Sequence, residues 1–151
     1  WENDGSEHFT QHNIAGGFEG STSVRVTDMD GDGDLDVLGS AYATAFHGYI
    51  LWWENNGAES FTQHMVDANF DGASSVYATD LDSDGDVDIL GSALEADEIT
   101  WWENDGSQNF TKHIIDGLFD RASSVHDADL DGDGDVDVLG TARNADDLAW
   151  W

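Results

Sequence analysis

Aspartate occupies every second position in three nine-residue segments of the chain, 28–36, 80–88 and 129–137. Each segment holds five aspartates and has glycine at its sixth position. These carboxylates repel one another strongly, because all of them lie within a Debye length of about 10 Å at 0.1 M salt. A cation bound by oxygen atoms would remove that repulsion. Ca²⁺ tolerates more and looser oxygen ligands than Mg²⁺, while zinc and copper favour His or Cys. We therefore predict three calcium sites per chain.

The alternate spacing divides the aspartates of each loop by role. Positions 1, 3, 5 and 9 can turn their carboxylates inward, while position 7 offers its backbone carbonyl. The predicted carboxylate ligands are Asp28, Asp30, Asp32 and Asp36, then Asp80, Asp82, Asp84 and Asp88, then Asp129, Asp131, Asp133 and Asp137. The predicted main-chain ligands are Asp34, Asp86 and Asp135. The glycines at position 6, which are Gly33, Gly85 and Gly134, supply a turn that a residue with a side chain resists.

The acidic loops admit two other interpretations. An EF-hand loop opens in the same way, but it requires a glutamate at position 12 and a helix on either side. Position 12 is glycine in all three copies, at Gly39, Gly91 and Gly140, and the preceding apolar pairs lead into predicted strands. A solvated acidic turn without metal is the simpler alternative, and the threefold repetition argues against it.

The whole chain is built from repeats. The phrase Trp-Glu-Asn-Asp/Asn-Gly begins at residues 1, 53 and 102, and Trp151 would open a fourth copy. We expect a single domain, 1–151, with repeats of approximately 1–52, 53–101 and 102–151. Each copy holds four short β-prone runs, and Asp-Gly or Asn-Gly between such runs is typical of β-hairpins. In the second copy these runs are 74–79, 87–91, 98–103 and 110–115.

Four short strands in each repeat of this length are typical of a β-propeller blade. We therefore predict an all-β fold with blades of four antiparallel strands, three blade-equivalents per chain, circularly permuted within a blade. The chain then starts at the end of a third strand, residues 1–15 form an orphan outer strand, and residues 121–151 form a blade that lacks this strand. An unpaired strand edge of this kind attracts a partner.

Three blades are too few for a closed ring, because propellers use about four to eight. We expect a homo-oligomer in which residues 1–15 complete a blade of another copy, giving a six-bladed ring from two chains or, if the rotation does not close, a filament. The alternative is that the chain is part of a longer propeller. The chain starts without an initiator methionine, which indicates a processed product or an excised piece.

The composition limits the partners. Acidic residues number 33 against 4 basic ones, so the formal net charge is -29. This charge argues against nucleic acid and anionic membrane surfaces, both of which are polyanions. No segment is long and apolar enough for membrane insertion. The chain has no cysteine, which leaves the redox compartment undecided, while its seven tryptophans argue against disorder.

The acidic loops resemble the calcium motif of FG-GAP and VCBS repeats, which are the blades of the integrin-α-type β-propeller. The shared pattern is Asp-x-Asp-x-Asp-Gly-x-x-Asp, followed by two apolar residues and glycine. The resemblance extends to Phe-x-Gly ahead of the first strand, at Phe18–Gly20 and Phe70–Gly72, whereas the third copy has Arg121 in place of the glycine. This departure leaves the local turn of the third copy open.

The resemblance implies calcium loops on one face of a propeller and ligand contacts from loops on the opposite face. It favours a calcium-binding structural or adhesion module that is extracellular or at the cell surface. The alternative is a lectin-like module that binds a carbohydrate or a protein through variable positions. Those positions are Arg25, Tyr77 and His126, which share one place in the innermost strand, and the loops 41–48, 93–97 and 142–146.

Two further patterns predict structure rather than chemistry. Adjacent tryptophans in a strand point to opposite faces, so we expect most of them to pack between blades. His12, His64 and His113 recur at one place in the fourth strand, and no set of acid and base residues recurs around them. We therefore predict no enzymatic activity.

Overall fold

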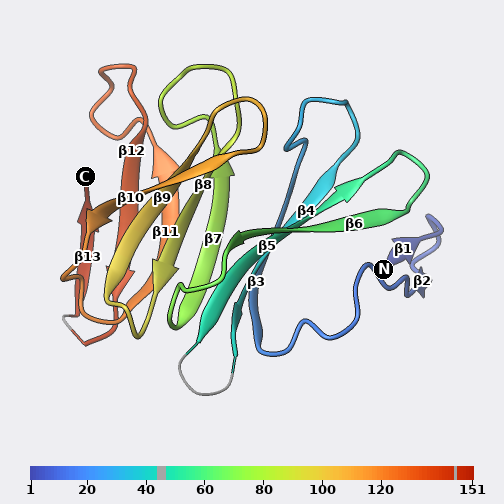
Figure 1. Ribbon diagram of the computed structural model, residues 1–151, viewed down its shortest axis with the longest axis horizontal. Helices are drawn as coiled ribbons and strands as arrows, with labels where there is room; N and C mark the ends of the chain where they lie inside the picture. The colour runs from blue at the N-terminus through green and yellow to red at the C-terminus, as the bar shows by residue number, and fades with distance from the viewer. Residues whose placement is uncertain (44–46, 145) are drawn as a thin grey trace.

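The computed structural model describes residues 1–43, 47–144 and 146–151. Thirteen strands form four antiparallel sheets, and the described residues contain no helix. The predicted all-β class is therefore confirmed. The sheets follow one another along the molecule in the order of the sequence (Figure 1).

The first and second sheets each have four strands, and each strand pairs with the next one along the chain. The first sheet consists of β3 (Ser21–Thr27), β4 (Asp36–Tyr42), β5 (Gly48–Asn55) and β6 (Phe61–Asp67). The second sheet consists of β7 (Ala73–Thr79), β8 (Asp88–Ala93), β9 (Glu98–Asn104) and β10 (Phe110–Asp116). The strands of the second sheet match the runs expected from the sequence to within two residues.

The third sheet has only three strands, β11 (Ala122–Ala128), β12 (Asp137–Ala142) and β13 (Asp147–Trp150). The fourth sheet is a small hairpin at the N-terminus, formed by β1 (Glu2–Asn3) and β2 (Phe9–Thr10). Residues 1–15 were expected to form an orphan outer strand, but residues 2–10 form a hairpin instead. The reason is that residues 1–3 repeat the end of β5, so they supply the third-strand partner of the hairpin.

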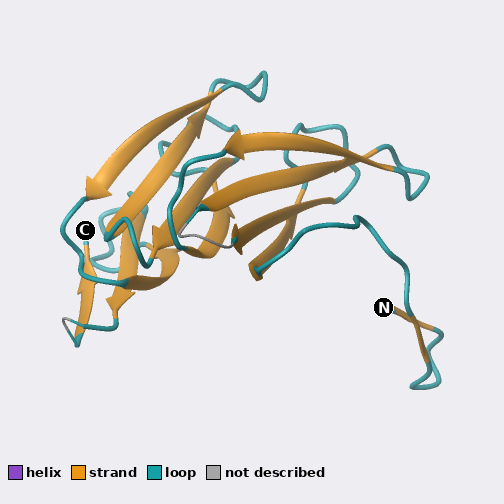
Figure 2. Cartoon of the chain, turned by 60° about the horizontal axis from the view of Figure 1, so that its bottom comes forward, coloured by secondary structure: helices purple, strands orange, loops and turns teal. Residues whose placement is uncertain are grey.

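The core lies between neighbouring sheets. One buried cluster joins the first sheet to the second and includes Leu38, Trp52 and Trp102. Another joins the second sheet to the third and includes Ile99 and Val125. The curved sheets pack face against face (Figure 2), so the predicted burial of tryptophan between sheets is found at Trp52 and Trp102.

A repeated hydrogen bond fixes the spacing of adjacent sheets. The Thr22 hydroxyl in β3 donates to the Ala73 carbonyl oxygen in β7 at 2.9 Å. At the equivalent place, the Ser74 hydroxyl in β7 donates to the Ala122 carbonyl oxygen in β11 at 3.0 Å. The first sheet is therefore attached to the second, and the second to the third, in the same way.

The turn ahead of the first strand keeps its shape where the sequence departs from the repeat. Gly72 has a φ of 74°, and Arg121 takes the same left-handed conformation with a φ of 59°. A left-handed conformation is costly for a residue with a side chain. The Arg121 backbone N–H donates to Asp97 Oδ1 at 2.8 Å, which helps to hold the strained turn.

Candidate metal sites

The three acidic loops connect the first and second strands of their sheets, β3–β4, β7–β8 and β11–β12. All three lie at the same end of the molecule, at the top of Figure 1. The strands on either side of each loop pair up to its last aspartate, as in the pairs Thr27–Asp36, Thr79–Asp88 and Ala128–Asp137. The paired strands therefore bring the two ends of every loop together.

The carboxylate of the first aspartate in the first and third loops accepts hydrogen bonds from backbone N–H groups later in the same loop. In the first loop, Asp28 accepts hydrogen bonds from the backbone N–H groups of Gly31 and Gly33, at 2.9 and 3.0 Å. Asp129 makes the same two contacts in the third loop. The glycine at position 6 has a φ of 95° to 99° in the three loops, a conformation that favours glycine. The predicted structural role of this glycine is confirmed.

Carboxylate oxygens converge in every loop. In each of three groups, one oxygen per residue lies within 4.8 Å of the others. The groups are Asp28, Asp30 and Asp32, then Asp80, Asp82 and Asp88, then Asp129, Asp131 and Asp137. Of the predicted carboxylate ligands, Asp36, Asp84 and Asp133 are outside these groups. The described residues thus contain three clusters that could hold a metal ion.

The aspartate at position 9 ties the loop to the strands. In the second loop, Asp88 is fully buried and accepts hydrogen bonds from the backbone N–H groups of Leu81 (3.0 Å) and Asn104 (2.8 Å). Asp36 accepts the equivalent bonds from Met29 and Asn55 in the first loop. One carboxylate thereby joins the acidic loop to the end of the third strand.

In the first two loops, the aspartate at position 7 packs its side chain on the turn between the third and fourth strands. A Cβ atom added at Gly57 would collide with the carboxylate of Asp34, and one added at Gly106 would collide with that of Asp86. Both glycines lie in the turn between the third and fourth strands and have a φ of 74°. The side chain at position 7 thus packs on that turn, an arrangement compatible with the predicted use of its main-chain oxygen.

The second cluster contains an oxygen that is suited to a cation. Asp80 Oδ1 is buried and has no hydrogen-bond partner among the described residues. Burial raises the pKa values of Asp82 and Asp88, and neighbouring carboxylates add to the effect. Leaving a buried acceptor without a partner costs free energy. The carboxylates of this cluster therefore fit a divalent cation with oxygen ligands.

The three residues proposed from the sequence as ligand contacts form a row across the three sheets. The Arg25 guanidinium lies over the Tyr77 ring, 5.3 Å from its centroid, and the rings of Tyr77 and His126 are 4.3 Å apart. The pKa of Tyr77 is raised by burial and then by the carboxylate of Asp127. Among the candidate loops, residues 44–46 of 41–48 and residue 145 of 142–146 lie outside the described residues.

The repeated histidines make contacts that sequence reasoning did not find. His64 stacks on Trp52, with ring centroids 4.4 Å apart, and its Nε2 lies 2.8 Å from Glu54 Oε2. His113 repeats both contacts in the second sheet. The signal was present in the sequence, because Glu, Trp and His recur together in each copy. Each histidine thus joins the third and fourth strands of its sheet.

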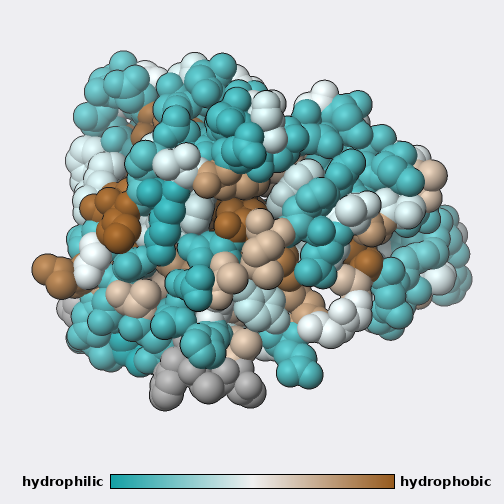
Figure 3. Space-filling view, in the orientation of Figure 1, coloured by the Kyte–Doolittle hydropathy of each residue, from teal (hydrophilic) through white to brown (hydrophobic). Residues whose placement is uncertain are grey.

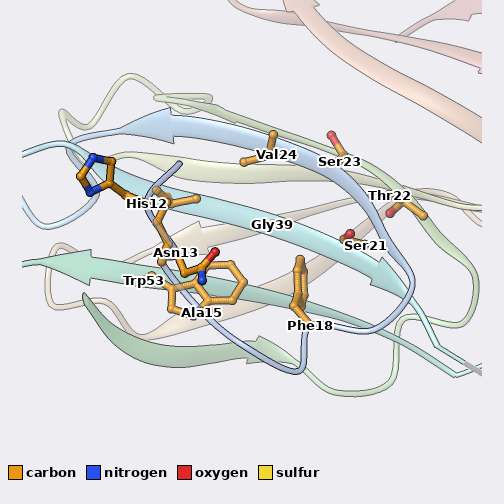
Figure 4. A pocket seen from close by; sticks show the side chains of 12 residues that line it. His12, Asn13, Ala15, Phe18, Ser21, Thr22, Ser23, Val24, Gly39 and Trp53 are labelled. Atoms are coloured by element: carbon orange, nitrogen blue, oxygen red, sulfur yellow. The ribbon is translucent and has the colours of Figure 1, made fainter. Parts of the chain in front are cut away.

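One cavity of about 420 Å³ lies on the free face of the first sheet. Figure 4 shows Phe18 and Trp53 on one side of it, with residues from the N-terminal segment close by. The described residues include no helix long and apolar enough to cross a membrane. A scan against models of protein families and a search of curated proteins found no match to the chain.

Proposed function

We propose that the chain is a calcium-stabilised segment of a β-propeller of the FG-GAP and VCBS type, serving as a structural or adhesion module outside cells. The observation that carries this proposal is Asp80 Oδ1, which is buried without a hydrogen-bond partner among the described residues and lies in a cluster of carboxylates that two other loops repeat. The module assembles with other copies of the chain, so that the sheets of one copy are followed by the sheets of the next.

The arrangement of the sheets supports the propeller part of the proposal. Two antiparallel sheets of four strands and one of three lie face to face, each joined to the next by the same hydrogen bond from its first strand. Propeller blades are four-stranded sheets that repeat around an axis. The three acidic loops then lie at one end of the propeller (Figure 1).

The donor atoms support calcium. Each loop offers carboxylate oxygens together with a backbone carbonyl, and Ca²⁺ prefers six to eight oxygen ligands in a flexible shell. A bound Ca²⁺ would neutralise carboxylates that otherwise repel one another and would hold together the first two strands of each sheet. Extracellular modules work with weak sites, because calcium outside cells is abundant.

A calcium titration of thermal unfolding tests the proposal. Calcium that binds only the folded chain at 100 times its Kd adds about 2.7 kcal/mol for one site. We expect the melting temperature to rise with Ca²⁺, to rise less with Mg²⁺, and to fall in EDTA. Asp82→Asn should reduce the calcium effect, whereas Glu59→Gln, which removes an exposed charge outside the loops, should leave it unchanged. A melting temperature indifferent to EDTA would count against calcium.

The second candidate is a lectin-like module that binds a carbohydrate or a protein. The observation in its favour is the row of Arg25, Tyr77 and His126, since adjacent aromatic rings beside a cation suit both kinds of ligand. A glycan array screened with the wild-type chain and with Tyr77→Ala tests this candidate. Binding that survives the substitution, or an array without any binder, would exclude sugar recognition by this row.

A further inference from the structure

The outer edge of β13 has no strand beside it among the described residues, whereas β5 and β9 pair on that edge with β6 and β10. We propose that residues 2–15 of a second copy complete this edge, with residues 2–3 continuing the line of β13 after Trp151 and residues 9–15 forming the fourth strand of the third sheet. In doing so they complete the third acidic loop and place the first sheet of the second copy next to the third sheet of the first copy. This interface rests on the propeller architecture proposed above.

The N-terminal hairpin already has the register of this missing strand. Its pairs Glu2–Thr10 and Asn3–Phe9 match Glu54–Thr62 and Asn55–Phe61 in the first sheet. In the first sheet the register continues with His64 opposite Trp52, and in the second with His113 opposite Trp101. The same register places His12 of the second copy opposite Trp150.

The first and second sheets each contain a histidine stacked on a tryptophan, His64 on Trp52 and His113 on Trp101. His12 and Trp150 are the equivalent histidine and tryptophan, and they lie at opposite ends of the chain. Trp150 is 49% exposed, whereas Trp52, its equivalent under His64, is 3% exposed. His12 keeps the bond of its counterparts to glutamate, since its Nε2 lies 2.9 Å from Glu2 Oε2. Residues 1–12 of the second copy therefore bring a histidine and its glutamate to a tryptophan that has neither.

The third acidic loop lacks one hydrogen bond that the other two loops have. Asp36 and Asp88 each accept a bond from the backbone N–H of an asparagine two residues after a tryptophan, at 2.8 Å in both cases. Within the described residues, Asp137 accepts only the bond from the Leu130 N–H. The equivalent asparagine is Asn3. A second copy would supply the Asn3 N–H to Asp137 and so finish the third loop.

The two end sheets expose complementary apolar residues. Val24 on the first sheet is 60% exposed, whereas its equivalent Val76 is 0% exposed because it packs on the preceding sheet. Leu148 on the third sheet is 76% exposed, whereas its equivalent Ile99 is 0% exposed. Figure 3 shows hydrophobic side chains on the surface at the end of the molecule where β13 lies. The third sheet of one copy and the first sheet of another can therefore pack through the same apolar positions that join neighbouring sheets within the chain.

The N-terminal segment of the same copy does not reach this edge, because it lies at the other end of the molecule. Figures 1 and 2 place the β1–β2 hairpin beyond the first sheet, far from β13 and the C-terminus. A contact that joins one end of a molecule to the opposite end of the next is heterologous. Such contacts give a ring if the rotation closes and a filament if it does not.

Sedimentation equilibrium in calcium tests the interface. We expect the wild-type chain to associate, and Leu148→Asp to weaken that association by at least about tenfold, which corresponds to about 1.4 kcal/mol. Leu118→Asp is the matched control, because Leu118 is 91% exposed and lies outside the end sheets' free faces, between β10 and β11. A monomeric wild-type chain, or equal effects of the two substitutions, would overturn the proposal. The calcium effect on melting, measured at a protein concentration where the chain is monomeric, reports on the metal sites separately from the interface.

Disulfide trapping tests the register. The chain has no cysteine, so an introduced pair reacts only with itself. The proposed register puts Asn13 of one copy opposite Ala149 of another, as Met65 lies opposite Leu51. Asn13→Cys with Ala149→Cys should form cross-linked chains on mild oxidation, because directly opposite residues are close enough for a disulfide. His12→Cys with Ala149→Cys points the two thiols to opposite faces. Equal cross-linking of the two double variants would refute this register.

Discussion

Replacement of Asp88 by alanine tests how far one carboxylate holds an acidic loop to its sheet. The substitution removes the acceptor of two backbone hydrogen bonds, from Leu81 at 3.0 Å and from Asn104 at 2.8 Å. A donor that loses its buried partner costs about 1 to 3 kcal/mol, so two donors cost about 2 to 6 kcal/mol. Burial raises the pKa of Asp88, so the charged form is itself destabilised in the fold and part of this loss is offset. We expect the metal-free chain to lose about 2 to 4 kcal/mol.

Asp137→Ala is the matched control, because Asp137 stands at the same place in the third loop and is only partly buried. It accepts one described backbone bond, from the exposed Leu130 N–H, so its removal should cost about 1 kcal/mol. Urea denaturation in EDTA at low protein concentration, followed by tryptophan fluorescence, measures both free energies of unfolding. Equal losses in the two variants, or a loss below about 0.5 kcal/mol for Asp88→Ala, would refute the reasoning.

Two further predictions concern packing and pH. Gly91→Ala should cost about 1 to 3 kcal/mol of unfolding free energy in urea, because its Cβ would lie 2.7 Å from the ring of Trp102. Gly117→Ala, whose Cβ would come no closer than 3.5 Å to a neighbour, should cost less, and equal costs would contradict the packing argument. Burial raises the pKa values of Asp30 and Asp82 above 3.8. A carboxyl with a raised pKa stabilises the fold below its unfolded pKa and loses that contribution as pH rises through the folded pKa. The metal-free chain should therefore melt higher on acidification from neutral pH towards that value, and Asp82→Asn should flatten this dependence. A metal-free chain that melts lower on mild acidification would contradict it.

The features that the sequence predicted are those set by local patterns repeated three times. Asp-Gly turns, alternating apolar residues and the tryptophan spacing place the strands of the second sheet at β7 to β10. The glycine at position 6 was predicted for the same reason, since the need for a positive φ is local. Repetition strengthens such predictions, because a chance pattern rarely recurs at the same spacing.

The features that the sequence did not reveal depend on register between strands. The bond from the Asn55 N–H to Asp36 joins residues 19 positions apart, and it exists only because β4 and β5 pair in one register. The stack of His64 on Trp52 likewise requires β5 and β6 to be aligned. Which carboxylates of a loop converge is equally hard to predict, because small rotations of the side chains decide it, and the first loop differs from the other two.

The acidic loop and the edge of its sheet form one physical unit. The aspartate at position 9 binds the loop through one carboxylate oxygen and the end of the third strand through the other, as Asp88 does with Leu81 and Asn104. Asn104, whose backbone N–H donates to this carboxylate, also begins the turn to the fourth strand, since its Oδ1 accepts a hydrogen bond from the Gly106 N–H. A sheet that lacks its fourth strand therefore also lacks part of the support for its acidic loop. Because binding equilibria that share a structural element are coupled in both directions, calcium at the third loop and strand addition at β13 should each favour the other.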